Sequence, residues 1–264
     1  MKNLQGIQKW CDLSEGKLQP YMSASKLNQF RNDLPMFVCK YGFGMKTKTS
    51  APMQRGLIVE KAVVEVLTKT LEIDEAITLA ESRFTSKFPL IADESIAKEF
   101  KSLEPFIRNS VEALEEFGCP EFDNGDQERI KFTMKDTVND WEVDFIGFLD
   151  LVYPDGTVID LKTTHRMPST QSYDHQLQRA IYQMAKSNHS VKFCYVTPRG
   201  FAFKEDGDVT QLMEEARLTV NRMNKFCEKF TPEEARQCIP QTNTFYWTGE
   251  NELKEFYNQE KESI

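Results

Sequence analysis

Two strand-like segments joined by a Pro-Asp-Gly turn constrain this chain more than any other feature. Residues 141–153 and 157–164 are rich in β-branched and aromatic residues, as strands are. The turn, Pro154–Gly156, suits a three-residue hairpin loop whose glycine takes the left-handed conformation. This loop sets Asp150 directly opposite Asp160 on one face of a sheet. A two-residue Asp-Gly loop would instead shift the register by one and send the two aspartates to opposite faces.

A lysine completes the predicted cluster. Lys162 lies two residues beyond Asp160 and therefore projects from the same strand face. Opposed carboxylates repel each other unless a cation lies between them. Two carboxylates, a lysine and a hard metal ion indicate a site that cleaves phosphodiester bonds. The acid-x-Lys pattern alone says little, because it recurs elsewhere in the chain, and an ordinary ion pair on a solvated strand is the alternative.

Length and composition indicate one large soluble domain. The chain has 264 residues, of which 40% are hydrophobic and 28% charged. No apolar run approaches membrane-spanning length, and the first residues do not resemble a signal peptide. Six scattered cysteines with no CxxC pair favour a reducing compartment. We expect a cytoplasmic protein, bacterial or phage-encoded in a host cytoplasm, with a core over about 21–204 and a helical extension over about 205–264.

The distribution of charge favours a nucleic-acid partner although the net charge is −8. Residues 161–204 contain seven Lys and Arg residues and one acid, Asp174, and residues 34–59 contain no acid at all. These two basic windows flank the predicted hairpin in sequence, as a phosphate-binding groove requires. The alternative is that both windows are ordinary solvated surface.

The pattern of apolar residues predicts an α/β fold: a central mixed sheet flanked by helices, with helical elaborations at both ends. We expect strands within 127–164, at 191–197 and at 201–204. Helices are expected at about 24–41, 52–70, 93–117, 173–186, 209–230 and 250–259, with a short one after Pro232.

Three further polar residues extend the candidate site. Glu60 interrupts an apolar helix stripe, and an unpaired carboxylate is costly to bury, so it requires a cation. A residue at the edge of the core is the alternative. Gln178 and Tyr182 lie four apart and project from one helix face, which His175 shares. On its own, such a pair is more often structural than functional.

Taken in order, these motifs resemble the PD-(D/E)XK nuclease superfamily, in particular its RecB-like exonuclease branch. The resemblance spans about residues 21–200 and implies a restriction-endonuclease-like core. The matching pieces are Ser23–Phe30, Gly56-xxx-Glu60, Gly147–Asp150, Asp160–Thr164 and Gln178-xxx-Tyr182.

The resemblance implies a set of roles. Asp150, Asp160, Lys162 and Glu60 would be catalytic, and the three carboxylates with the Leu161 carbonyl would hold Mg²⁺ or Mn²⁺, which prefer oxygen ligands. Some relatives hold an iron–sulfur cluster on four cysteines, one near the position of Cys39 and a tight trio near the C-terminus. Cys227 and Cys238 are eleven apart with no third partner nearby, so we expect no cluster. DNA-binding residues would be Gln178, Tyr182, Arg55, Arg166, Arg179 and Ser25.

The expected function is therefore that of a metal-dependent DNA exonuclease in replication, recombination or repair. Its substrate would be single- or double-stranded DNA with a free end, and phage or bacterial replication and recombination proteins are possible partners. The alternatives are a structure-specific or restriction-type endonuclease, or a non-catalytic DNA-binding protein that retains the nuclease fold.

Overall fold

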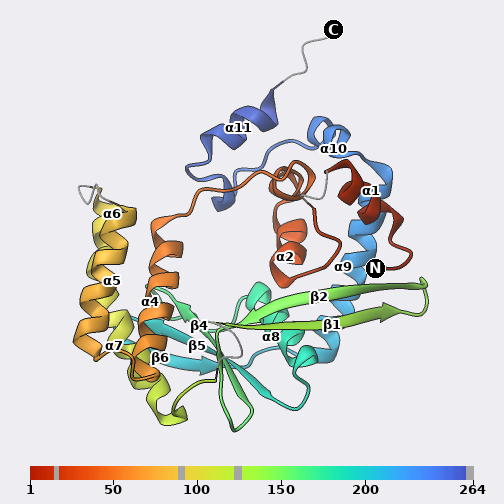
Figure 1. Ribbon diagram of the computed structural model, residues 1–264. Coiled ribbons are helices and arrows are strands. Elements are labelled where there is room, and N and C mark those ends of the chain that lie inside the picture. The colour runs from red at the N-terminus through yellow and green to blue at the C-terminus, as the bar shows by residue number, and fades with distance from the viewer. Residues whose placement is uncertain (15–17, 89–92, 122–126, 260–264) are drawn as a thin grey trace. The chain divides into compact units, whose positions relative to one another are not determined.

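The computed structural model describes residues 1–14, 18–88, 93–121 and 127–259 (Figure 1). Its chain divides into two compact units. The first unit comprises 1–48, 131–147 and 208–264, and the second comprises 49–130 and 148–207. The predicted hairpin and its lysine belong to the second unit. The assignment of the whole chain to one domain stays a prediction.

The second unit contains a four-stranded mixed sheet with helices on both faces. Strand order is β3-β4-β5-β6, in which β4 and β5 are parallel and the two outer pairs are antiparallel. This confirms the predicted α/β class. In chain order the elements are α4 Ala51–Leu67, α5 Ile73–Lys87, α6 Glu94–Lys101, α7 Leu103–Leu114, the 3-10 turn η2 Glu115–Phe117, β3 Leu151–Val152, β4 Thr157–Thr163, α8 Tyr173–Ala185, β5 Ser190–Thr197 and β6 Gly200–Lys204.

Because side chains alternate along β4, one face of this sheet is apolar and the other carries the polar site residues. On β4, Ile159 and Leu161 join the hydrophobic core that α4, α5 and α7 build against the sheet. Asp160 and Lys162 therefore point the other way, toward α8, because successive side chains of a strand alternate. The core thus fixes which face of the strand carries the polar residues.

Local sequence sets where the site-bearing helices begin. Ser50 caps α4 by accepting a hydrogen bond from the backbone N–H of Met53, and a proline occupies the first turn. Ser172 caps α8 in the same way. The helix predicted over 93–117 is instead split at Ser102 into α6 and α7. Pro105 has no N–H with which to continue the hydrogen-bond ladder across that point.

The strand predicted over 141–153 is also divided. Strands β1 (Glu128–Asp136) and β2 (Trp141–Leu149) form a separate two-stranded sheet, and β3 begins only after a bend at Asp150. Asp140, in the turn between β1 and β2, lies at positive φ. At this bend the Asp150 side chain accepts a hydrogen bond from the backbone N–H of Leu161 on β4.

The first unit is mainly helical. Helix α1, like α5 of the second unit, was not predicted. It packs on α9 so closely that a Cβ at Gly6 would lie 2.1 Å from the Asn224 carbonyl oxygen, so only glycine fits there. No helix in the described ranges is long and apolar enough to cross a membrane. The elements are α1 Gln5–Leu13, α2 Ala24–Asn32, α3 Leu34–Phe37, the π-turn η1 Val38–Gly42, α9 Val209–Lys229, α10 Pro232–Cys238, the 3-10 turn η3 Phe245–Trp247 and α11 Asn251–Asn258.

Candidate active site

The hairpin register confirms that two aspartates face each other. Leu151 pairs with Ile159 and Val152 with Val158, so the next pair outward is Asp150 with Asp160. Gly156 has φ +84°, as the three-residue loop requires. The Asp150 carboxylate also accepts a hydrogen bond from the backbone N–H of Leu161, at 3.1 Å.

Asp160 is held between strand and helix. Its carboxylate forms an ion pair with the ammonium group of Lys162 and accepts a 2.9 Å hydrogen bond from Gln178 Nε2 on α8. The same amide nitrogen lies 2.8 Å from the Tyr182 hydroxyl. Burial alone would lower the pKa of Lys162, but the charges of the nearby carboxylates, Asp160 foremost, raise it. Both members of the predicted Gln/Tyr pair thus contribute to one network with a predicted catalytic carboxylate.

Glu60 joins the cluster through a residue that the sequence did not indicate. Gln127 Nε2 donates to Glu60 at 2.8 Å and to Asp150 at 3.0 Å, so a single amide nitrogen bridges the two carboxylates. Burial, and then the charges of Asp160 and Glu60, raise the pKa of Asp150 well above its ordinary value. Gln127 stands immediately before β1 with no motif around it, so no sequence signal could have marked it.

These carboxylates suit a divalent cation. Within the described ranges no three acidic, histidine or cysteine side chains already converge as a preformed metal site. Donors occupy the carboxylates instead: the Gln127 amide lies between Glu60 and Asp150, and the Lys162 ammonium contacts Asp160. An N–H donor shared by two carboxylates occupies the position that a cation would take, and the all-oxygen set matches Mg²⁺ or Mn²⁺.

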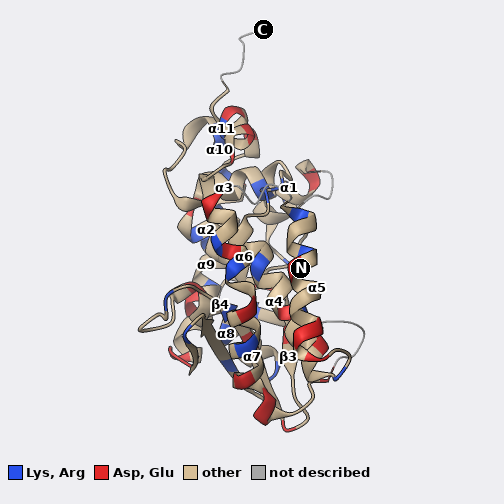
Figure 2. Ribbon diagram, turned by 90° about the vertical axis from the view of Figure 1, so that its left-hand side faces the viewer, with Lys and Arg blue, Asp and Glu red and all other residues tan. Residues whose placement is uncertain are grey.

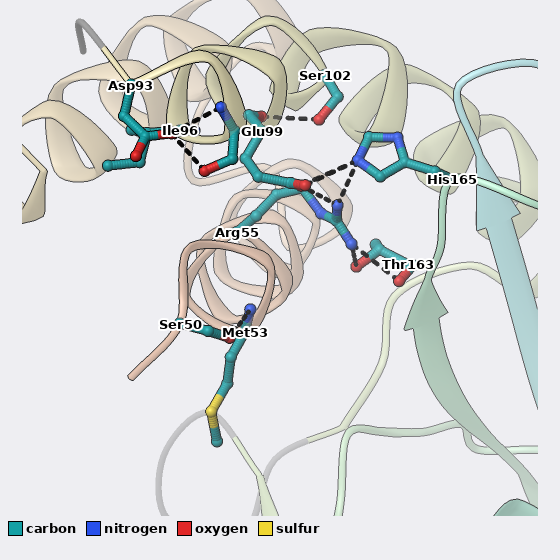
Figure 3. Close-up of polar contacts among 10 residues, drawn as sticks. Ser50, Met53, Arg55, Asp93, Ile96, Glu99, Ser102, Thr163 and His165 are labelled. Carbon is teal, nitrogen blue, oxygen red and sulfur yellow. Dashed lines mark hydrogen bonds and ion pairs between the residues drawn. The ribbon is translucent and has the colours of Figure 1, made fainter. Parts of the chain in front are cut away.

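A buried charge network lies beside β4 (Figure 3). Arg55 on α4 forms an ion pair with Glu99 on α6, and the two side chains are only 4% and 8% exposed. Arg55 also donates to the Thr163 carbonyl at 3.0 Å and stacks on the Phe106 ring at 4.4 Å. His165 Nε2 lies 3.0 Å from both carboxylate oxygens of Glu99. This network ties the helix that carries Glu60 to the end of β4.

The predicted DNA-binding arginines differ in burial. Arg55 and Arg179 are buried, and Arg179 donates to the carbonyls of Asp206 and Gly207 at 3.2 and 2.7 Å. Their guanidinium groups are occupied by protein partners, so we no longer place them on a phosphate-binding surface. Arg166 is exposed. Ser25 belongs to the first unit, in the first turn of α2, where its hydroxyl lies 3.0 Å from that of Ser23.

His175 has a structural partner. Its Nδ1 lies 2.5 Å from the Tyr195 hydroxyl on β5. Burial, and then the charge of Lys162, lower the pKa of His175, which favours the neutral ring. Burial also raises the pKa of Tyr195 to about 12. The pair fills the space between α8 and the sheet.

Comparison with known proteins shows the family and the fold of this chain. The family model of the PD-(D/E)XK nuclease superfamily matches residues 21–243. The fold is similar to the crystal structure of a "putative exonuclease" from Eubacterium rectale, with 14% sequence identity and a TM-score of 0.50 over 86% of this chain and 91% of that one. A second solved structure, SSO0001, has 18% identity and a TM-score of 0.33 over 64% of this chain and 85% of that one. Comparison with curated proteins gives no match. With its family model matched over most of its length, the chain belongs to the PD-(D/E)XK nuclease superfamily.

Proposed function

We propose that the protein is a DNA exonuclease that hydrolyses phosphodiester bonds with Mg²⁺ or Mn²⁺ and acts in DNA replication, recombination or repair. The observation that carries the proposal is the opposition of Asp150 and Asp160 on the hairpin, with Lys162 bound to one carboxylate and Glu60 linked to the other through Gln127. Mutual repulsion makes such a cluster costly to fold, and a nuclease site provides the reason to keep it.

The carboxylates of Glu60, Asp150 and Asp160, with the Leu161 carbonyl, would hold the ion. When bound, a divalent cation supplies Lewis-acid stabilisation of the charge that develops on the phosphoryl oxygens. The Gln127 amide would leave its bridging position as the ion enters. Because the amide is neutral, its displacement leaves the total charge of the cluster unchanged.

The remaining residues position substrate and carboxylates. The Lys162 ammonium lies against Asp160 and over the Phe193 ring, 5.2 Å from its centroid, and would donate to a phosphoryl oxygen. Gln178 holds Asp160 in one orientation from α8 and is itself held by Tyr182. Both are partly or fully buried, so we assign them to positioning of the carboxylate as well as to the DNA strand.

Exonuclease action, rather than endonuclease action, is supported by the resemblance to the RecB-like branch and by the name of the similar solved structure. One fold hosts many activities, so the fold by itself does not determine whether DNA is cut from an end or internally. The requirement for a free end is therefore the property to measure.

The test is a gel assay with linear and circular DNA, labelled at either end, single- and double-stranded, with Mg²⁺, Mn²⁺ or EDTA. We expect metal-dependent shortening of linear DNA and no cleavage of circles. Asp160→Asn, which keeps the shape of the side chain, should lose at least about 100-fold in rate. Cleavage of circles would favour an endonuclease. Binding without cleavage in every metal would favour a non-catalytic DNA-binding protein.

A further inference from the structure

A pocket of about 540 Å³ opens at the carboxyl end of the catalytic strand. It lies within the second unit, between the α6–α7 junction and the segments that follow β4 and β5. Among its lining residues are Lys98, Lys101, Ser102, His165 and Pro198. His165 follows the last residue of β4 by two positions, so the pocket continues from the strand that carries Asp160 and Lys162.

His165 is held rigidly at this pocket. Its Nε2 lies 3.0 Å from Arg55 Nη1 and from both oxygens of Glu99, and its ring packs edge-on against Phe106 at 5.6 Å. The other ring nitrogen, Nδ1, lies on the side of the ring away from Glu99 (Figure 3). A carboxylate that binds one imidazole nitrogen fixes the ring orientation and leaves the second nitrogen for a ligand. The Arg55–Glu99 ion pair thus holds His165 in an orientation suited to binding a ligand.

The rim of the pocket carries unpaired positive charge. Lys98 and Lys101 lie in the last turn of α6 and are both exposed. Figure 2 shows basic residues in blue on this helix. Arg166 and Arg199, which follow His165 and Pro198 in the chain, are exposed as well. Within the described part of the chain none of these four side chains forms an ion pair. Glu94 is the acid among the lining residues, and Glu99 is already neutralised by Arg55.

Distance relates this pocket to the reaction centre. His165 lies three positions beyond Lys162, which is at most about 10 Å of extended chain. A nucleic-acid strand places one phosphate roughly every 3.4 Å along a helix axis. A strand whose scissile phosphate lies at Asp150 and Asp160 can therefore present a phosphate within about three nucleotides to this pocket.

We propose that the pocket formed by Lys98, Lys101 and His165 binds a backbone phosphate of the nucleic-acid strand, up to about three nucleotides from the bond that is cleaved. The inference rests on the proposed function, because it takes the nuclease substrate as the ligand. It gives the buried Arg55–Glu99 pair a positioning task in place of the phosphate contact that the sequence suggested.

The experiment measures binding without turnover. Affinity of Asp160→Asn protein for a short fluorescent single strand is followed against salt concentration. Adding Lys98→Gln and Lys101→Gln should weaken binding and flatten the plot of log K against log [salt] by about 0.7 for each phosphate that is no longer neutralised. The matched control is Lys69→Gln with Lys87→Gln, two exposed lysines of the same unit, which changes the net charge equally. Equal effects of the two pairs would overturn the proposal.

A second variant tests whether Glu99 acts by positioning His165 or only through its negative charge. Glu99→Gln removes a negative charge, so simple electrostatics predicts tighter phosphate binding. If Glu99 positions His165, Glu99→Gln instead binds the strand more weakly, as His165→Gln does. The part of the salt dependence that Lys98 and Lys101 contribute stays unchanged. Tighter binding by Glu99→Gln would refute the positioning role. Circular dichroism confirms folding, and His165→Gln, which leaves the buried pair intact, keeps the test valid if Glu99→Gln fails to fold.

Inorganic phosphate distinguishes the two sources of the ligand. A site for free phosphate would show a thermal shift with inorganic phosphate that the Lys98/Lys101 variant lacks, while both proteins bind DNA equally, and this result would reject a strand-binding site. Loss of the proposed function gives a different pattern: the parent protein binds DNA through this pocket but cleaves none in any metal.

Discussion

Asp150→Asn should stabilise the protein without metal and abolish its stabilisation by metal. The parent buries Asp150 beside Asp160, at 8% and 1% exposure, with Glu60 linked to the same cluster and Lys162 as its cation. The pKa of Asp150 is raised, so the comparison is made at a pH high enough to ionise it, where two unit charges about 5 Å apart repel by roughly 3 kcal/mol at an effective dielectric constant of 20. The substitution removes that repulsion but keeps the shape of the side chain.

Two losses reduce the gain. The asparagine cannot accept hydrogen bonds from both Gln127 and the Leu161 N–H, and one lost hydrogen bond costs about 1 kcal/mol. Its attraction to Lys162 is lost as well, but its repulsion from Glu60, which shifts the pKa of Asp150 more than Lys162 does, is lost with it, and the two roughly cancel. A net gain of about 1–2 kcal/mol remains, which corresponds to a rise in Tm of roughly 2–8 °C for a protein of this size.

Metal should reverse the order of stability of the parent protein and Asp150→Asn. A ligand at 100 times its Kd stabilises the folded state by about 2.7 kcal/mol, so Mg²⁺ or Mn²⁺ should raise the Tm of the parent by roughly 5–10 °C. Asp150→Asn, lacking a central ligand, should not respond. Scanning calorimetry is the suitable measurement, because Trp10, Trp141 and Trp247 all lie in the first unit and do not report directly on this site. The reasoning would be refuted if Asp150→Asn had a lower Tm than the parent in EDTA and its Tm rose as much with metal.

Three further outcomes are expected. Glu60→Gln should lower the apparent metal affinity about 10–100-fold, with activity recovered at higher Mn²⁺; normal turnover at ordinary metal concentration would remove Glu60 from the site. Arg55→Met leaves Glu99 charged and buried and should cost about 3–5 kcal/mol in urea unfolding, most of it restored by adding Glu99→Met; a single-variant loss under about 1 kcal/mol would contradict a buried ion pair. Burial, and then the charge of Asp33, raise the pKa of Cys39 from 9.0 to about 12, so this thiol contributes stability below pH 9 that is lost as pH rises toward 12. Cys39→Ala should therefore flatten the alkaline loss of stability by up to about 1.4 kcal/mol per pH unit, and an unchanged slope would exclude the thiol as its source.

Local features of this chain were predictable and long-range partners were not. The hairpin register follows from a three-residue loop and from period-two alternation, so the residue pattern alone places Asp150, Asp160 and Lys162 on one face. The spacing of Gln178 and Tyr182 likewise follows from helix geometry.

Arg55 shows where such reasoning ends. A basic residue in an acid-free window is expected at the surface, yet its acidic partner Glu99 lies 44 positions later on another helix. The same holds for Gln127, whose two carboxylate partners come from α4 and from the residue that precedes β3. Sequence patterns report which face a residue takes within its own element. They do not report which distant element covers that face.

The division of the chain into two units has a consequence for synthesis. Residues 49–130 and 148–207 contain the whole candidate active site, and all of them are made before residue 208. The first unit cannot be completed so early, because α1 packs on α9, and Gly6 N–H donates to Asn224, 218 positions later. The N-terminal helices must therefore wait, with apolar faces uncovered, until residues 208–229 leave the ribosome. A pause in translation after residue 207 would lengthen the time for which this apolar surface is exposed, and exposed apolar surface promotes aggregation.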